Sequence, residues 1–177
     1  MVGAAAGPTS LGDSEGAFAP RFPSRAAMRL NYLTVSPDGF QAQLGLEQYI
    51  LNCGLEHSLL ELVKTRASQI NGCAYCLDMH TKDARAEGES EQRLYALSAW
   101  EETPFFTERE RAALAWTEAV TLVAESRVPD AVYEQARGQF TEKELADLTF
   151  AIVAINGWNR LAIAFRAEVG SYQRANR

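Results

Sequence analysis

The sequence predicts an all-α fold, and three observations lead to that prediction. Apolar residues recur at every third or fourth position through long segments, above all through residues 55–70. Pro37 and Pro129 stand where helices are expected to begin, and no proline falls inside a predicted helix. No segment alternates convincingly between polar and apolar residues in the manner of a half-buried strand.

The first two predicted helices are bounded by clear sequence signals. Ser36-Pro37-Asp38 supplies an N-cap followed by proline at the first helical position, and Gly54 can end that helix. The second helix covers Leu55 to Ile70, and Asn71-Gly72 closes it. An Asn-Gly pair also occurs in hairpins, but the helical period of the flanking segments favours a helix C-cap.

The next two helices are expected at residues 73–87 and 90–101. Gly88 ends the first of them, and Ser90 begins the second. Together with the preceding helix they form the part of the chain that holds two of its three cysteines.

Two capping boxes predict the helices of the C-terminal half. Thr107–Glu110 and Thr141–Glu144 both have the form Thr-x-x-Glu, and Pro129 begins a short helix between them. The apolar segment after the second box is expected to break at Asn156-Gly157. A last helix would then run to about Arg174.

Two short sequence matches suggest repeated helix pairs. Phe-Thr-Glu-x-Glu begins at positions 106 and 140, and Ile-Asn-Gly begins at positions 70 and 155. Both matches are too short to establish a repeat family.

The bulk composition is that of one globular domain. The 177 residues are 47% hydrophobic and 23% charged, with a formal net charge of −6. We expect an all-helical domain at residues 26–177 and a disordered leader at residues 1–25, which are rich in Gly, Ala, Pro and Ser. Met28 also leaves open an over-long gene start.

The charge and the apolar runs restrict the partners and the compartment. The acidic balance and the lack of a basic cluster predict no nucleic-acid partner and no binding to an anionic membrane surface. No apolar run approaches the ~20 residues of a membrane span, and no basic segment precedes the first Ala-rich stretch. We therefore expect a cytoplasmic protein.

Cys73, Cys76 and His80 form the most distinctive cluster of the chain. They lie in the stretch NGCAYCLDMH, in a sequence with only three cysteines and two histidines. If Asn71-Gly72 ends one helix, Cys73 begins the next, and the three side chains fall within an arc of roughly 60° on one face. The sulfurs are then one turn apart, and His80 lies one turn further along.

This arrangement suits thiol redox chemistry. A helix N-terminus and a nearby imidazole both stabilise a thiolate, which is the reactive form of cysteine. A histidine one turn away can move a proton to a leaving oxygen. The two thiols can then close to a disulfide, from which an external dithiol recovers them.

The preceding helix supplies further polar groups. His57, Glu61 and Lys64 share one face, and the tight Asn-Gly turn folds this helix back alongside the next. Glu61 is a candidate to orient the histidine, although the sequence geometry alone does not select it over Glu56 or Asp78. No nucleotide, haem or flavin motif is visible.

Two other interpretations of the cysteine pair stay open on these residues alone. A structural zinc ion needs four ligands, and the two cysteines with His80 supply three. His57 or Glu61 would be the fourth, but a second CxxC or a His-x-x-x-His is absent. The cysteines could instead be small buried hydrophobic residues, as is expected for Cys53.

Aromatic and amide residues in the C-terminal half have less specific meanings. Trp100, Trp116 and Trp158 lie among apolar neighbours and are expected in the core or in subunit contacts. Asn156, Trp158 and Asn159 are expected either to line a pocket or to turn the chain between helices.

The stretch from Arg29 to about Arg166 resembles the alkylhydroperoxidase D-like (AhpD-like) branch of the carboxymuconolactone decarboxylase family. The family's pattern is a glutamate, a cysteine twelve residues later, then x-x-Cys and x-x-x-His. The matching residues here are Glu61, Cys73, Cys76 and His80. The flanking text ELVKTRASQINGCAYCLDMHTKDARAEGE and the later AINGWNRLAIAF are also similar to the family's peroxidase-related members.

This resemblance implies both an architecture and an activity. It implies a bundle of about seven to eight helices that assembles as a homo-oligomer, a trimer or hexamer. It implies a peroxidase acting on hydrogen peroxide or organic hydroperoxides, in which Cys76 attacks the peroxide and Cys73 resolves. Glu61 and His80 would form the proton relay. No bound cofactor or metal is implied; the reductant is an external dithiol, in the best-known branch a lipoyl carrier protein.

Tyr75 marks a departure from that branch, which has a histidine immediately before the second cysteine. Tyr75 is therefore a candidate pocket wall or proton donor, and His57 is a second candidate pocket residue. Members that decarboxylate lactones lack the cysteine pair, so we expect no decarboxylase activity here. Protein disulfide exchange, with Cys73 as the attacking thiol, and a non-enzymatic redox-sensing or metal-binding module are the alternatives.

Overall fold

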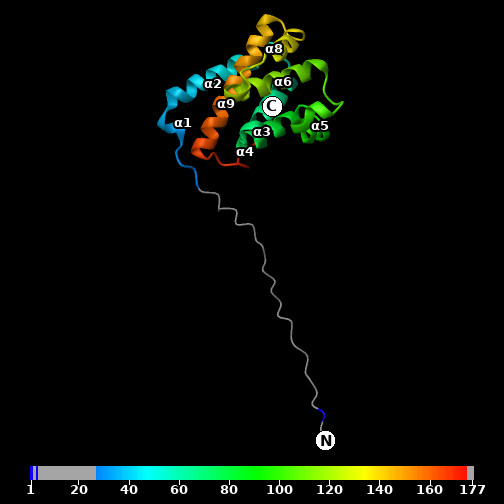
Figure 1. The fold of residues 1–177 in the computed structure, drawn as a ribbon. Helices are drawn as coiled ribbons and strands as arrows, with labels where there is room; N and C mark the ends of the chain where they lie inside the picture. The colour runs from blue at the N-terminus through cyan, green and yellow to red at the C-terminus, as the bar shows by residue number, and fades with distance from the viewer. Residues whose placement is uncertain (2, 4–26, 175–177) are drawn as a thin grey trace.

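The computed structural model describes residues 1, 3 and 27–174, and its helices, which lie between Tyr32 and Phe165, form an all-α bundle (Figure 1). Among these residues there are nine α-helices, one 3-10 helix and no strand, so the predicted fold class is confirmed. The predicted leader at residues 1–25 lies almost wholly outside the described residues. The helices are α1 (Tyr32–Val35), α2 (Pro37–Leu51), α3 (His57–Asn71), α4 (Ala74–Ala86), α5 (Glu91–Ala96), η1 (Leu97–Glu102), α6 (Glu108–Thr121), α7 (Val123–Ser126), α8 (Asp130–Arg137) and α9 (Glu142–Phe165).

Capping residues set the start of several helices, as the sequence predicts. The side chains of Ser90, Thr107 and Thr141 each accept a hydrogen bond from the backbone N–H three residues later. At both threonines the glutamate at that third position accepts a bond from the threonine's own N–H, which completes the capping box. Pro37 is the first residue of α2. The short helices α1 and α7 were not expected, although the side chain of Asn31 caps α1 by accepting from the backbone N–H of Leu33.

Helix α3 lies at the centre of the bundle, against α4, α6 and α9 (Figure 1). Its side chains Leu59, Leu60, Leu62 and Val63 are almost completely buried. Removing each aliphatic side chain of this size from water stabilises the fold by about 1.5–3 kcal/mol. The helix that carries Glu61 is therefore held rigidly by its packed neighbours.

Helix α9 is long and apolar enough to cross a membrane by length and composition, with a mean hydropathy of 1.4. In the structure it instead packs against α2, α3 and α6 and buries Leu148, Ile152 and Ile155. A helix that is apolar on most sides is expected in a protein core as well as in a bilayer. The packing identifies α9 as a core helix of this bundle.

The predicted break at Asn156-Gly157 is wrong, because α9 continues through it to Phe165. The glycine instead lets α2 approach closely. Gln43 Nε2 donates to the backbone oxygen of Ala154 at 2.9 Å, and a β-carbon on the glycine would lie 2.9 Å from the same nitrogen. The predicted end near Arg174 is also wrong. Helix α9 ends at Phe165, its C-cap Arg166 has a left-handed backbone, and the segment beyond it is not helical.

Candidate thiol active site

The turn between α3 and α4 places the two cysteines. Helix α3 ends at Asn71, and Gly72 caps it with φ 68° and ψ 31°, a left-handed conformation that glycine adopts without strain. Cys73 is the N-cap of α4, and Cys76 lies in its first turn, as the sequence predicts. Helix α4 then packs back along α3, so the two cysteines lie beside the helix that carries Glu61.

The two sulfurs are in direct contact. Cys73 Sγ and Cys76 Sγ are 2.9 Å apart, both thiols are free, and each residue is only 1% exposed. Both pack against an apolar cluster that includes Ala67, Ile155 and Ala162. Of the two cysteines, Cys76 lines a cavity and Cys73 does not. A small molecule in the cavity therefore reaches the sulfur of Cys76 first.

The thiol pair releases its first proton more readily than an ordinary cysteine does. The hydrogen bond from Cys76 is the largest influence on Cys73 and, against the cost of burial, lowers the pKa of the Cys73 thiol to about 7. The pKa of the Cys76 thiol is raised. The largest cause is its hydrogen bond with Cys73, and burial and the charge on Cys73 act in the same direction. The two thiols therefore titrate as a coupled pair, which gives up its first proton more readily than its second.

His80 and Glu61 form a hydrogen-bonded pair between α4 and α3. His80 Nδ1 lies 2.8 Å from Glu61 Oε2, and both side chains are largely buried. Burial alone would raise the pKa of the Glu61 carboxyl, but the hydrogen bond from His80 and the charges of His80, Lys64 and His57 overcome it and lower that pKa. Because the ionised carboxylate accepts from Nδ1, Nε2 of His80 is left for proton transfer.

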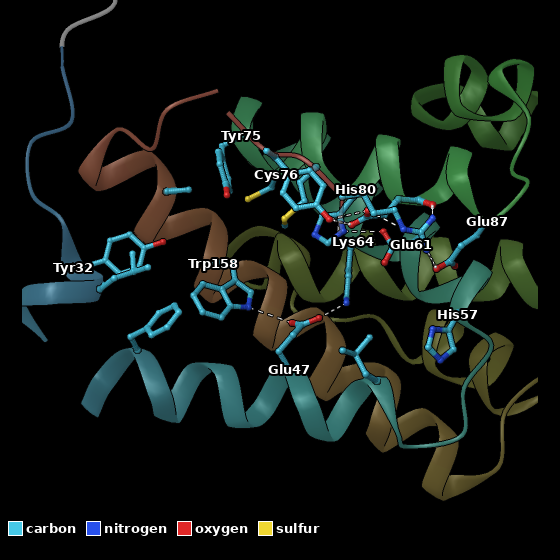
Figure 2. Close-up of a pocket in the computed structure, with 18 residues that line it drawn as sticks. Tyr32, Glu47, His57, Glu61, Lys64, Tyr75, Cys76, His80, Glu87 and Trp158 are labelled. Carbon is cyan, nitrogen blue, oxygen red and sulfur yellow. Dashed lines mark hydrogen bonds and ion pairs between the residues drawn. The ribbon is translucent and has the colours of Figure 1, made fainter. Parts of the chain in front are cut away.

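A cavity of about 480 Å³ connects these groups (Figure 2). In Figure 2 the rings of Tyr32 and Trp158 lie towards one end, and His57 and Glu87 lie towards the other. Its lining comprises Tyr32, Leu33, Phe40, Glu47, Leu51, His57, Glu61, Lys64, Tyr75, Cys76, Met79, His80, Asp83, Glu87, Trp158, Ala162, Tyr172 and Arg174. The cavity therefore combines an aromatic end with a charged end, and the reactive groups open into it.

The structure separates the three acidic candidates for the partner of the histidine. Glu56 pairs with Arg109 on the outer surface, at 2.9 Å, and Asp78 pairs with Lys82 one turn along α4, also at 2.9 Å. Glu61 is the one of the three that contacts the imidazole. The two candidate pocket residues, Tyr75 and His57, both line the cavity. Cys53 packs, half-buried, against the main core, as expected.

A buried ion pair in the cavity wall was not predicted. Lys64 is only 2% exposed and is paired with Glu47 of α2, whose other oxygen accepts from Trp158 Nε1 at 3.2 Å (Figure 2). A buried ammonium group requires such a partner. Trp100 and Trp116 are buried core residues, as expected. Trp158 packs against the cluster that holds the two cysteines and also lines the cavity, which confirms the alternative that it lines a pocket. The helical face that Lys64 shares with Glu61 could have indicated that Lys64 lies at the site, but no sequence pattern predicted its partner Glu47.

The segment after α9 forms one side of the cavity, which no sequence pattern predicted. Tyr172 Oη donates to the carboxylate of Asp83 at 2.9 Å, and burial together with this bond raises the pKa of Tyr172 to about 12. Arg174 pairs with Glu87 at 3.0 Å. All four side chains line the cavity, so the C-terminal segment contributes its wall.

One group of side chains in the described part of the chain could hold a metal ion, namely Glu61, His80 and Asp83, whose candidate ligand atoms lie within 4.8 Å of one another. Neither cysteine belongs to this group. Glu61 already binds the imidazole, and Asp83 accepts from Tyr172. The sequence left open a zinc site formed by the two cysteines and His80. The structure does not group these three residues as metal ligands.

Comparison with known proteins gives the family. Residues 37–119 match the carboxymuconolactone decarboxylase family, and this range contains Glu61, both cysteines of the motif and His80. The uncharacterized protein YdfG of Bacillus subtilis is 43% identical over 138 residues, which cover 78% of this chain and 94% of YdfG. The chain therefore belongs to the carboxymuconolactone decarboxylase family.

Solved structures agree with this assignment and refine it. A protein of Agrobacterium tumefaciens, named as a candidate antioxidant-defence protein AhpD, is 46% identical and has a TM-score of 0.80; the match covers 82% of this chain and 100% of that one. The chain is thus an AhpD-like member of the family. The debrominase Bmp8, at 20% identity and a TM-score of 0.71 over 78% of this chain and 75% of its own, shares the fold.

Proposed function

We propose that this protein is a thiol-dependent peroxidase that reduces hydrogen peroxide or organic hydroperoxides. One observation carries the proposal: Cys76 lines the cavity with its sulfur 2.9 Å from that of Cys73, and His80 lines the same cavity. The family and the similarity to an AhpD candidate support an oxidoreductase-type enzyme with an antioxidant role. The finer mechanism follows from the chemistry of the site.

In the first step Cys76 becomes the nucleophile. The Cys73 thiolate is the nearest base and takes the proton of Cys76. The Cys76 thiolate then attacks the peroxide, the O–O bond breaks, and a sulfenic acid and an alkoxide or hydroxide form. His80 is held by Glu61 through its Nδ1–H; with both ring nitrogens protonated, it gives the Nε2 proton to that leaving oxygen and regains one from solvent. Tyr75 lines the same cavity and is a second candidate donor.

In the second step Cys73 resolves the intermediate. Its sulfur attacks the sulfenic sulfur of Cys76, an S–S bond forms, and water leaves with the proton of the Cys73 thiol. The dithiol and one hydroperoxide have then become a disulfide, an alcohol and water. An external dithiol of the lipoyl type resets the pair by thiol–disulfide exchange. We place this cycle in the cytoplasm and in a homo-oligomer, a trimer or hexamer.

The burial of the sulfurs separates this function from protein disulfide exchange. Exchange with a folded protein would require Cys73 to reach a disulfide on the partner's surface, but Cys73 is 1% exposed and does not line the cavity. A peroxide and a small dithiol are compact enough to react within the cavity. A redox-sensing module would react once and would not turn over.

Peroxide consumption by the pre-reduced, metal-free protein, with dihydrolipoamide as reductant, tests the proposal. We expect many turnovers by the intact chain and none by Cys76→Ser, because the attacking sulfur is gone. Cys73→Ser should consume about one equivalent and stop, since the sulfenic acid has no resolving thiol.

Cys53→Ser is the matched control, because Cys53 lies outside the cavity; we expect full turnover. Lack of consumption by the intact, reduced protein would overturn the peroxidase assignment. If Cys73→Ser consumed no peroxide while Cys76→Ser still consumed it, Cys73 would be the attacking thiol and Cys76 the resolving thiol.

A further inference from the structure

Asn159 is a fully buried polar residue on the face of α9 that packs against the cysteines. It is 0% exposed. Ile155 and Ala162, one helical turn before and after it, both belong to the apolar cluster that contains Cys73 and Cys76. A buried amide is costly unless its oxygen and its nitrogen both find partners, so its hydrogen bonds reveal how it is oriented.

Asn71 and Ser68 fix the orientation of this amide. Asn71 Nδ2 donates to Asn159 Oδ1 at 2.8 Å, and Asn159 Nδ2 donates to Ser68 Oγ at 3.0 Å. The single hydroxyl hydrogen of Ser68 is already given to the backbone oxygen of Lys64 at 2.7 Å, so Ser68 can only accept from the amide. The oxygen of Asn159 therefore faces Asn71, and its nitrogen has a second hydrogen to donate.

Because Ile155 and Ala162, on either side of Asn159, pack in the same cluster as the two cysteines, this second hydrogen belongs to the face of α9 that meets the sulfurs. Hydrogen bonding from Asn159 lowers the pKa of Cys73, after the larger influences of Cys76, burial and the Cys76 backbone. The same amide lowers the pKa of Cys76, where the bond to Cys73, burial and the charge on Cys73 all act in the opposite direction. The single N–H donor of Asn159 thus stabilises the thiolate, whether the negative charge lies on Cys73 or on Cys76.

We propose that Asn159 is a thiolate-stabilising residue of the dithiol site, which donates its free Nδ2 hydrogen to the sulfur that bears the negative charge. As the proton moves from Cys76 to Cys73, the donor follows the charge from one sulfur to the other. The role in peroxide attack rests on the proposed function, whereas the effect on thiol ionisation can be measured independently of it. Asn71 acts through Asn159, by holding the amide in this orientation.

The test is the pH dependence of alkylation of the reduced protein by iodoacetamide, in a Cys53→Ser background so that only the pair reacts. Asn159→Leu keeps the volume and removes the donor to the charged form, so the thiol pKa should rise. We expect the midpoint, about pH 7 before the change, to rise by about one pH unit.

Asn156→Leu is the matched control. Asn156 lies one turn earlier in α9 and also binds Asn71, but its amide nitrogen donates to Thr121 and to the backbone oxygen of Ile152, away from the sulfurs. We expect its midpoint to stay unchanged. An unchanged midpoint in folded Asn159→Leu, or an equal shift in both variants, would overturn the proposal.

Two further readouts keep the inference testable. If Asn159→Leu does not fold, the side-chain NH₂ resonance of Asn159 in the unsubstituted, ¹⁵N-labelled protein should shift with the thiol midpoint; a resonance without that step would refute the inference. In the peroxidase assay, Asn159→Leu should react about fivefold more slowly at pH 7 and recover as pH rises above its new midpoint. A chain that titrates as expected but consumes no peroxide would refute the proposed function and retain the role of Asn159 in thiolate stabilisation.

Discussion

The tripeptide Ile-Asn-Gly occurs at residues 70–72 and at 155–157, and the two copies adopt different structures. The first ends α3 with Gly72 in the left-handed conformation, whereas α9 runs through the second without a break. A β-carbon on Gly72 would meet nothing within 4 Å, whereas one on Gly157 would lie 2.9 Å from Gln43 Nε2. The packing around each glycine, and not the local sequence, decides whether the helix ends.

The two copies also meet in the folded protein. Asn71 Nδ2 donates to Asn156 Oδ1 at 3.0 Å, as well as to Asn159. The end of α3 is therefore tied to the middle of α9, directly behind the turn that begins with Gly72. One copy shapes the turn that carries the cysteines, and the other belongs to the helix that supports it.

Among the substitutions that test the two Ile-Asn-Gly copies, Gly72→Val should have the largest effect on stability. A β-branched residue at φ 68° costs about 1–2 kcal/mol, and the turn that positions Cys73 would be disturbed. We expect the free energy of unfolding, measured by urea titration, to fall by that amount, and the low thiol midpoint to be lost.

Gly72→Asn is the control for this change, because asparagine tolerates the left-handed conformation better than other residues with a side chain. It should lose clearly less stability than Gly72→Val. Equal stability of the valine variant and the unsubstituted protein would show that the turn does not require a left-handed residue.

Gly157→Ala should give a smaller effect, whose sign depends on Gln43. Alanine is favoured over glycine inside a helix by about 1 kcal/mol, but here its β-carbon displaces the Gln43 side chain from Ala154. In a Gln43→Ala background that conflict is gone, so Gly157→Ala should stabilise the protein by about 1 kcal/mol. Thermal or urea unfolding of the four chains of this double-mutant cycle measures the difference. The same gain in both backgrounds would refute the packing explanation.

The sequence predicted those features that depend on local signals. The capping boxes at Thr107 and Thr141 are where expected, because a cap is formed by residues three positions apart. Cys73 begins α4 because Gly72 ends α3 immediately before it, which is also a local signal. Glu61 could be selected over other nearby acids only through the family resemblance, and the structure brings it to His80 at 2.8 Å.

The features that the sequence did not predict depend on segments far apart in the chain. Glu47 reaches Lys64 from α2, and Tyr172 reaches Asp83 from the segment after α9. No local spacing signals such contacts, since each joins two segments that meet only in the folded chain. The break expected in α9 failed for the same reason, because Asn-Gly is a helix terminator only where the surroundings leave room for a turn.

The measurement that tests the central claim most directly is the site of the first oxidation. Reduced Cys73→Ser and Cys76→Ser proteins would each receive one equivalent of hydrogen peroxide in the presence of dimedone, and peptide mass spectrometry would locate the trapped sulfenic acid. Because Cys76 lines the cavity and Cys73 does not, we predict a dimedone adduct on Cys76 in the first protein and none on Cys73 in the second. An adduct on Cys73 with an unmodified Cys76 would contradict the account.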